Sequence, residues 1–139
     1  SPDEVEVADV DVLSPCALGG LIAADVVPAL QAAAVCGGAN NQLADESLAD
    51  VLAARGVVYA PDFLVNAGGV IAVGAEYAGR GTYDDAAARE RARGIGATLL
   101  DVLRRADAEG ITPLTAAERL AEDRIAAAPP RESFAPPAR

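Results

Sequence analysis

The stretch Val57-Val-Tyr-Ala-Pro-Asp-Phe-Leu-Val-Asn-Ala-Gly-Gly-Val70 decides the fold. Its first four residues have strand character, Pro61 ends them, and Asn66 then stands directly before two glycines and an apolar run that suits a helix. An amide at the mouth of a strand, followed by residues without bulk, is how α/β proteins let a ligand approach the backbone. Two earlier stretches, residues 12–20 and 34–41, have the same form.

The first half of the chain alternates predicted strands and helices. Apolar and acidic residues alternate over residues 5–13, and a short apolar run over 33–36 is typical of a buried strand. A helix is expected over 21–31, interrupted at Pro28, and another from an Asp45 N-cap to Gly56, with one apolar face formed by Leu48, Val51 and Leu52. These βαβ units predict a parallel sheet, which places ligands beyond the carboxyl ends of its strands.

The second half is predicted to be helical. One helix covers residues 70–78, and Thr82 with Asp85 resembles a capping box that opens a long helix ending at Gly110. Thr112 and Pro113 suit the N-cap and first position of a last helix, to about residue 128. The proline-rich segment 129–139 predicts a disordered tail. The apolar face of the long helix consists of Ile95, Leu99, Leu103 and Ala106.

Composition limits the chemistry that the chain can perform. The 139 residues suffice for one domain with a core, and the net charge of −10 argues against nucleic acid as a partner. All 11 basic residues are Arg, and Lys, His, Met and Trp are absent. Their absence excludes a Schiff base, a lysine or imidazole base and a His-ligated metal.

The two cysteines, Cys16 and Cys36, lie 20 residues apart, which is not a metal-binding spacing. Each follows a predicted strand, so both are expected to be free thiols buried as small hydrophobes. A cytoplasmic location is therefore expected. Because no apolar run reaches membrane-spanning length and no leader pattern opens these 139 residues, neither a membrane helix nor a signal peptide is expected.

A glycine-rich phosphate turn is missing. A complete dinucleotide-binding domain needs G-x-G-x-x-G after its first strand, and this chain has only Gly79-Arg80-Gly81 between two predicted helices. The fold is thus either no dinucleotide fold or the later half of one, and the order of elements favours the later half. An unrelated flavodoxin-type domain would also need a phosphate loop. From the residues alone, Asn40, Asn41 and Asn66 suit turn and helix caps as well as a ligand site.

Three ordered motifs closely resemble the Glu/Leu/Phe/Val dehydrogenase family, in particular its branched-chain and phenylalanine members. They are residues 14–20 (SPCALGG), 37–43 (GGANNQL) and 58–70 (VYAPDFLVNAGGV), and the resemblance covers about residues 5–127. It implies an α/β fold: the second half of a Rossmann-type NAD-binding domain with about three parallel strands over residues 1–78, C-terminal helices over 79–128, and a tail over 129–139.

The resemblance also implies NAD-dependent oxidative deamination of a branched-chain or aromatic L-amino acid to a 2-oxo acid and ammonia. Asn66 is expected to stand between cofactor and substrate and to donate its amide to the substrate carboxylate. The helix around residues 95–98 is expected to line part of the pocket for the substrate side chain. The residues implied in cofactor binding follow the three strands: Cys16, Ala17 and Leu18 beside the nicotinamide riboside, and Ala39, Asn40 and Asn41 beside the nicotinamide ring.

Several parts of the family pattern are absent. The catalytic lysines and aspartate of the N-terminal domain and the phosphate-binding glycines have no counterpart, and Ile22-Ala23-Ala24 replaces a usual Leu-Asn-Asp run. The chain is therefore expected to be the C-terminal portion of an enzyme, inactive alone, that forms a homo-oligomer or pairs with the missing N-terminal part. The alternative is a non-catalytic α/β module or remnant that pairs with another chain.

Overall fold

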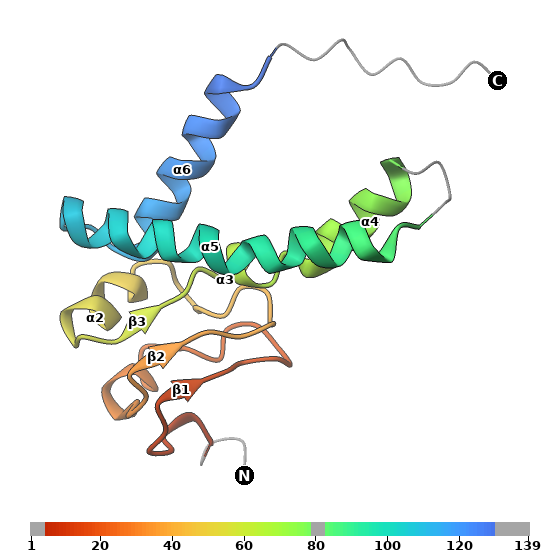
Figure 1. Ribbon diagram of the computed structural model, residues 1–139. Helices are drawn as coiled ribbons and strands as arrows, with labels where there is room; N and C mark the ends of the chain where they lie inside the picture. The colour runs from red at the N-terminus through yellow and green to blue at the C-terminus, as the bar shows by residue number, and fades with distance from the viewer. Residues whose placement is uncertain (1–4, 79–82, 130–139) are drawn as a thin grey trace.

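The computed structural model describes residues 5–78 and 83–129. Its sheet has three short parallel strands in the order β1 (Val12–Leu13), β2 (Ala34–Val35) and β3 (Val58–Tyr59). Val35 pairs with Leu13 on one side and with Tyr59 on the other. The predicted α/β class with about three parallel strands is confirmed. We call residues 5–66 the sheet part and residues 68–129 the helical part (Figure 1).

The core of the sheet part forms around β2 and the helix α2 (Leu48–Ala54). Leu48 and Leu52 of α2 are buried as predicted, but Val51 is 45% exposed, so its assignment to the apolar face is wrong. Gly56 follows the helix with φ 73°, the left-handed conformation expected after a helix C-terminus. The buried apolar side chains of this core include Ile22, Val27, Leu30, Val35, Leu52 and Tyr59.

Two predicted elements of the sheet part are wrong. The strand expected over residues 5–13 is reduced to β1, because β2 is only two residues long and offers no ladder to the earlier residues. The helix expected over 21–31 is reduced to the 3₁₀ turn η1 (Val27–Ala29). Ile22 instead forms a parallel bridge with Leu43, and its N–H donates to the Gln42 carbonyl at 3.0 Å. That bridge holds the backbone extended where the helix would begin.

The start of α2 also differs from the prediction. Asp45 Oδ1 accepts the backbone N–H of Ser47 at 2.9 Å, and the helix begins only at Leu48, with Ser47 at the N-cap position. The carboxylate thus closes a turn ahead of the helix instead of capping its first turn.

The sheet part ends with the short helix α3 (Asp62–Val65). The helical part contains α4 (Gly68–Ala78), α5 (Asp85–Glu109) and α6 (Pro113–Ala127). Asp84 caps α5 by accepting the N–H of Ala87 at 3.0 Å, while the Thr82 of the predicted capping box lies outside the described residues. Thr112 caps α6 with Pro113 in its first turn, as predicted. Gly110, with φ 64°, ends α5 as predicted.

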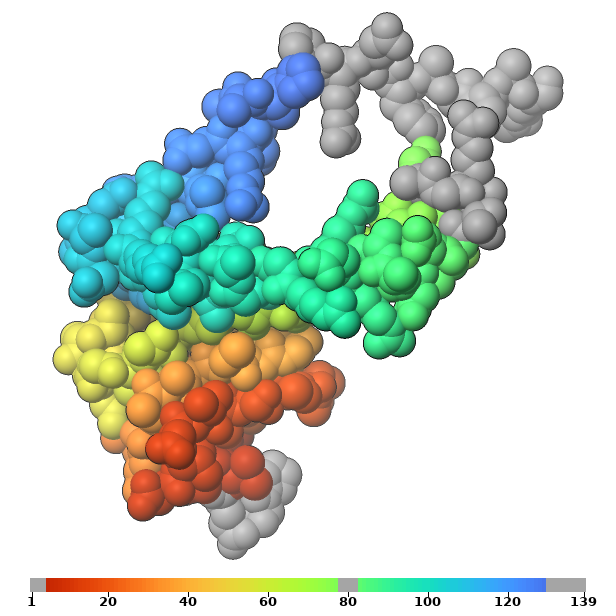
Figure 2. All heavy atoms as spheres, in the orientation of Figure 1, coloured from red at the N-terminus to blue at the C-terminus, as the bar shows by residue number. Residues whose placement is uncertain are grey.

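Packing in the helical part is centred on α5 and α6. Val102, Ala106, Ala116 and Ala117 are buried between these two helices. The predicted face residues Ile95, Leu99 and Leu103 are half-buried, and the prediction omitted two buried residues of α5, Ala88 and Val102. In the space-filling view α6 rises from one end of α5, and α4 lies toward the other end (Figure 2).

Two further statements concern the extent of the chain. Of the predicted tail 129–139, residues 130–139 lie outside the described residues, and the division at residues 78 and 128 stays a prediction. Among the helices in residues 5–78 and 83–129, none is both long enough and apolar enough to span a membrane.

Candidate functional site

The loops that follow β1 and β2 press directly against each other. The backbone N–H of Ala39 donates to the Pro15 carbonyl at 2.9 Å, and that of Gly38 donates to Cys16 Sγ at 3.5 Å. At Gly37 a Cβ atom would lie only 2.1 Å from the Pro15 carbonyl oxygen. Glycine is thus required at position 37 because backbone, which cannot move aside easily, fills the space of a side chain.

The loops that follow β2 and β3 are joined by side-chain amides and a carboxylate. Asn66 Nδ2 donates to Asn40 Oδ1 at 2.6 Å and to the Ala39 carbonyl at 3.3 Å. Asp62 Oδ2 accepts the backbone N–H of Gln42 at 2.9 Å. The structure therefore brings Ala39, Asn40 and Asn66, three of the residues predicted for the site, into one hydrogen-bonded group at the carboxyl ends of the strands.

Gln42 is a residue of this region that the prediction missed. Its side chain is 0% exposed, and its Nε2 donates to the carbonyls of Gly37 at 2.7 Å and Ala39 at 3.0 Å. Its Oε1 has no hydrogen-bond partner among the described residues. A buried amide that satisfies two loop carbonyls fixes the path of the loop. The only signal in the sequence is a glutamine directly after two loop asparagines.

Asp62 is the second residue that was missed. Besides holding Gln42, it stands at the first position of α3, directly after Pro61. A carboxylate in the first turn of a helix is favourable in itself. The sequence therefore indicates only a helix start at Asp62, and not a hydrogen bond between the loops that follow β2 and β3. Burial, and in addition the nearby Asp62 carboxylate, raises the pKa of Tyr59 to about 12, which keeps this phenol protonated at neutral pH.

Asn41 lies apart from the group formed by Asn40 and Asn66. It adopts φ 51°, a left-handed conformation that Asn tolerates better than most residues. It lines a separate hollow of about 330 Å³ together with Asp45, Tyr59 and Asp62.

The residues predicted after β1, Cys16, Ala17 and Leu18, line a hollow of about 690 Å³. All three are exposed. The expectation that both thiols are buried is therefore wrong for Cys16, and Cys36 is half-buried. Cys16 follows the buried Pro15 at the point where the loop turns outward, so its thiol meets the neighbouring loop and not the core. A hydrogen bond with Ser14, and a second from the Gly38 N–H, lower the pKa of the Cys16 thiol.

The chemistry available at this edge is binding and orientation. It provides two asparagine amides, loop carbonyls and N–H groups, and a thiol, and no cluster of acidic, Cys or His side chains suited to a metal ion occurs among the described residues. The sequence contains neither Lys nor His. Neutral amides both donate and accept hydrogen bonds, so the edge suits a ligand with amide or carboxylate groups.

Comparisons with known proteins agree with the predicted resemblance. The model of the family Glutamate/Leucine/Phenylalanine/Valine dehydrogenase matches residues 1–132. Valine dehydrogenase of Streptomyces coelicolor is 47% identical over 127 residues, which cover 91% of this chain and 34% of that protein. Leucine dehydrogenase of Bacillus cereus is 40% identical over 125 residues, which cover 90% of this chain and 33% of that protein.

A solved structure shows the same fold. The crystal structure of L-tryptophan dehydrogenase from Nostoc punctiforme is similar with a TM-score of 0.85 and 44% sequence identity, and the match covers 90% of this chain and 37% of that one. The chain spans about a third of the length of the curated relatives that it matches.

Proposed function

Because the chain belongs to the glutamate/leucine/phenylalanine/valine dehydrogenase family, we propose that it is the C-terminal portion of an NAD-dependent L-amino acid dehydrogenase. The reaction is the reversible oxidative deamination of a branched-chain or aromatic L-amino acid to a 2-oxo acid and ammonia. Relatives named for valine, leucine and tryptophan support this substrate class. The cofactor, when bound, accepts a hydride from the substrate.

The nicotinamide half of the cofactor fits the hollow at the carboxyl ends of the strands. Cys16, Ala17 and Leu18 line it and are proposed to contact the nicotinamide riboside. Asn40, whose side chain is exposed beside Asn66, and the neighbouring residues Ala39 and Asn41 are proposed to border the nicotinamide ring and its carboxamide. Amide and carbonyl groups complement a carboxamide because both partners donate and accept.

The substrate is proposed to lie over Asn66, at the start of α4. Asn66 is half-exposed, and its neutral amide can bind the substrate carboxylate without altering the charges on either ligand. Val70 and Val73 lie three positions apart in α4, which begins two residues after Asn66, and they therefore share one side of that helix. These side chains are 77% and 68% exposed, and they offer an apolar surface to an apolar substrate side chain.

The remaining parts of the enzyme are proposed to come from outside this chain. A base is needed, and the sequence contains neither Lys nor His to supply it. An exposed sheet edge favours binding of a further strand or chain. Among the described residues β1 is an edge strand of the sheet, and Val10 and Val12 are exposed there. We propose a cytoplasmic protein in which that edge is covered by the N-terminal part of the enzyme, within a homo-oligomer.

The observation that carries this proposal is the hydrogen bond between Asn66 and Asn40, which joins the proposed substrate and cofactor positions. A chimera provides the test. This chain replaces the matching third of the Streptomyces coelicolor valine dehydrogenase, and NADH formation is followed with L-valine, L-leucine and L-tryptophan.

We expect the chimera to turn over and the isolated chain to form no NADH. Asn66→Ala should lower kcat/KM of the chimera by roughly tenfold or more, the usual cost of a lost hydrogen bond to a charged group. Asp101→Asn, on the exposed outer side of α5, is the matched control. Turnover by the isolated chain, or an unchanged kcat/KM in Asn66→Ala, would refute the proposal.

A further inference from the structure

Both hydrogens on the Asn66 side-chain nitrogen are used within the chain. An amide nitrogen carries two hydrogens, and Nδ2 donates to Asn40 Oδ1 at 2.6 Å and to the Ala39 carbonyl at 3.3 Å. A backbone carbonyl only accepts, so the Asn66 atom that faces Ala39 must be the nitrogen and not the oxygen. Without a ligand, Asn66 therefore has no free donor for a carboxylate.

The two contacts of Asn66 differ in how firmly they are held. The Ala39 carbonyl also accepts from Gln42 Nε2 at 3.0 Å, and that glutamine is fully buried. The position of the Ala39 carbonyl is thus fixed from inside the protein. Asn40 is exposed, and the described residues provide its Oδ1 with no donor besides Asn66. The Asn40 contact is the one that a ligand can replace.

We propose that the hydrogen bond between Asn66 and Asn40 couples the cofactor position to the substrate position by exchanging partners. The nicotinamide carboxamide donates to Asn40 Oδ1, and one hydrogen of Asn66 Nδ2 then becomes free for the substrate carboxylate. This inference rests on the proposed function and concerns the same site. Under this proposal, Asn66 donates to a carboxylate only after its hydrogen bond to Asn40 has been broken.

The exchange makes the two ligands bind cooperatively. Whichever ligand binds first has to break the hydrogen bond between the two asparagines, and the second ligand does not. A single hydrogen bond of this kind corresponds to an affinity ratio of about three- to tenfold, within the range of ordinary coupling between sites. The coupling must be reciprocal, so the carboxylate also raises the affinity for the carboxamide by the same factor.

The first experiment uses the full chain without ligands. In the ¹⁵N-labelled protein the side-chain NH₂ group of Asn66 is observed by NMR, and its hydrogen exchange with water is measured. Asn40→Ala removes the acceptor and should accelerate that exchange by at least about threefold, the factor that corresponds to one lost hydrogen bond. Asn40→Asp keeps an acceptor oxygen and should preserve the protection. Equal exchange in Asn40→Ala and the unaltered chain would overturn the proposal.

The second experiment adds ligands to the same samples. Nicotinamide mononucleotide represents the cofactor, because it lacks the adenylate half, and a branched 2-oxo acid represents the substrate. In the unaltered chain, saturating mononucleotide should tighten 2-oxo acid binding, and this tightening should be about three- to tenfold smaller in Asn40→Ala. The attraction between the positive nicotinamide ring and the carboxylate is present in both proteins and cancels in this comparison.

The outcomes separate the two ideas. If both ligands bind to the unaltered chain but the tightening is the same in Asn40→Ala, the exchange is refuted and the proposed function stands. If neither ligand shifts any signal near Asn40 or Asn66, the proposed binding roles fail and the exchange fails with them. Loss of protection in Asn40→Ala, its retention in Asn40→Asp and a smaller tightening in Asn40→Ala together support the exchange.

Discussion

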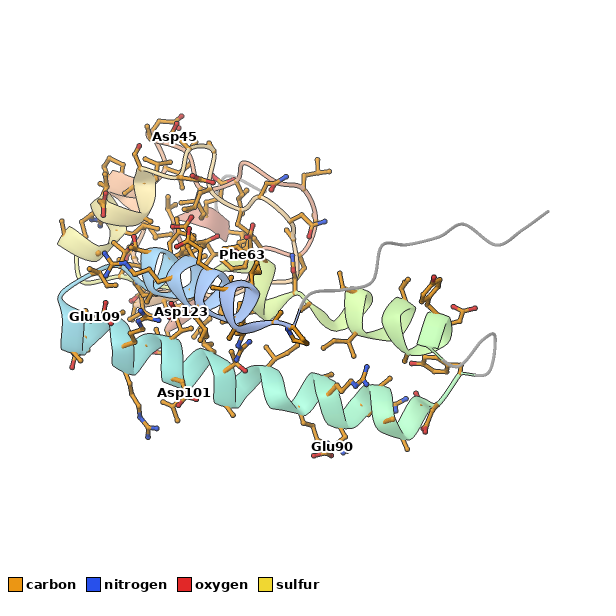
Figure 3. All side chains as sticks on the ribbon, turned by 90° about the horizontal axis from the view of Figure 1, so that it is seen from above. Asp45, Phe63, Glu90, Asp101, Glu109 and Asp123 are labelled. Atoms are coloured by element: carbon orange, nitrogen blue, oxygen red, sulfur yellow. The ribbon has the colours of Figure 1, made fainter. Side chains whose placement is uncertain are left out.

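The sheet part and the helical part of this chain are held together in different ways. Large apolar side chains such as Ile22, Leu52 and Tyr59 fill the core of the sheet part, and its loops are joined by buried or half-buried hydrogen bonds. Between α5 and α6 of the helical part, three of the four buried core residues are alanines. Arg105 and Arg119 add ion pairs at the surface of these two helices, and their acidic partners Glu109 and Asp123 are labelled in Figure 3.

Charge follows the same division. Residues 1–66 contain ten acidic residues against the single Arg55, a net charge of −9. Residues 67–139 contain eleven acidic residues and ten arginines, a net charge of −1.

Directional hydrogen bonds and close backbone contacts fix the atoms of the candidate site, whereas alanine packing and exposed ion pairs only hold supporting helices together. Substitutions in the two parts should therefore differ in size and even in sign.

The largest effect is expected where the two site loops touch. In Gly37→Ala the new Cβ would lie 2.1 Å from the Pro15 carbonyl oxygen and 2.5 Å from the Pro15 nitrogen. Because both are backbone atoms, the loops have to separate, and we expect a loss of at least about 3 kcal/mol in the free energy of unfolding. Urea denaturation followed by circular dichroism measures it.

Gly38→Ala is the matched control for this substitution. Its Cβ would lie 3.7 Å from Cys16 Sγ, an ordinary contact, so the adjacent glycine should tolerate the same change. Equal losses in the two variants would contradict the idea that close backbone contact holds these loops.

A smaller loss is expected at the buried glutamine. Gln42→Leu keeps most of the side-chain volume but leaves the Gly37 carbonyl without its donor and the Ala39 carbonyl with only the 3.3 Å hydrogen bond from Asn66. An unpaired buried polar group costs about 1–3 kcal/mol, and removal of the unpaired Oε1 offsets part of that cost. Gln31→Leu, at an exposed glutamine with one hydrogen bond to the Val7 carbonyl, should change the stability much less. Equal urea midpoints for the two variants would contradict the idea that the buried amide of Gln42 stabilises the loop.

The sequence predicted best those features that depend on neighbouring residues. The strands β2 and β3, the caps of α6 and the glycines that end α2 and α5 follow local rules and are confirmed. Residues 21–31 were predicted wrongly because their conformation depends on the distant bridge between Ile22 and Leu43. That Asn40 and Asn66 lie at the same edge followed from the parallel sheet, which brings strand ends together, but the hydrogen bond between them was not predicted. Gln42 was missed because burial of a polar side chain leaves no periodic signal in the sequence.

Glycines of the helical part should behave in the opposite way to Gly37. At Gly96, within α5, a Cβ would meet nothing within 4 Å, so Gly96→Ala should raise the free energy of unfolding by about 0.5–1 kcal/mol through helix propensity. Gly110→Ala is the contrasting variant, because φ 64° disfavours an L side chain and should cost about 1 kcal/mol. If Gly96→Ala destabilised the chain in urea, α5 would depend on a close backbone contact at Gly96, as the site loops depend on one at Gly37.

The smallest effect is expected from the ion pairs between α5 and α6, and it depends on pH. A hydrogen bond from Arg105, together with Arg119, lowers the pKa of Glu109 below its ordinary value of 4.5. A group whose pKa is lower in the folded state stabilises the fold above its unfolded pKa, and that contribution disappears as the pH falls through the folded pKa. Amide hydrogen exchange in α6 should therefore accelerate as the pH falls below about 4.5 by more than it does in Glu109→Gln, which cannot titrate.

Arginine variants identify the partner responsible for this pH dependence. Arg105 Nε lies 2.7 Å from Glu109 and its NH1 lies 2.9 Å from Asp123 on α6, so Arg105→Ala should remove most of the acid sensitivity of α6. Arg104, the next residue along α5, makes only one exposed contact among the described residues, 3.8 Å from Asp101, and Arg104→Ala should leave the profile unchanged. Exposed ion pairs contribute little, which is why this effect ranks below the helix glycine. If the unaltered chain, Arg105→Ala and Arg104→Ala all lost α6 protection equally in acid, packing of Val102 and the alanines alone would hold the two helices together. The contrast with the sheet part would then rest on the size of the core side chains and not on charge.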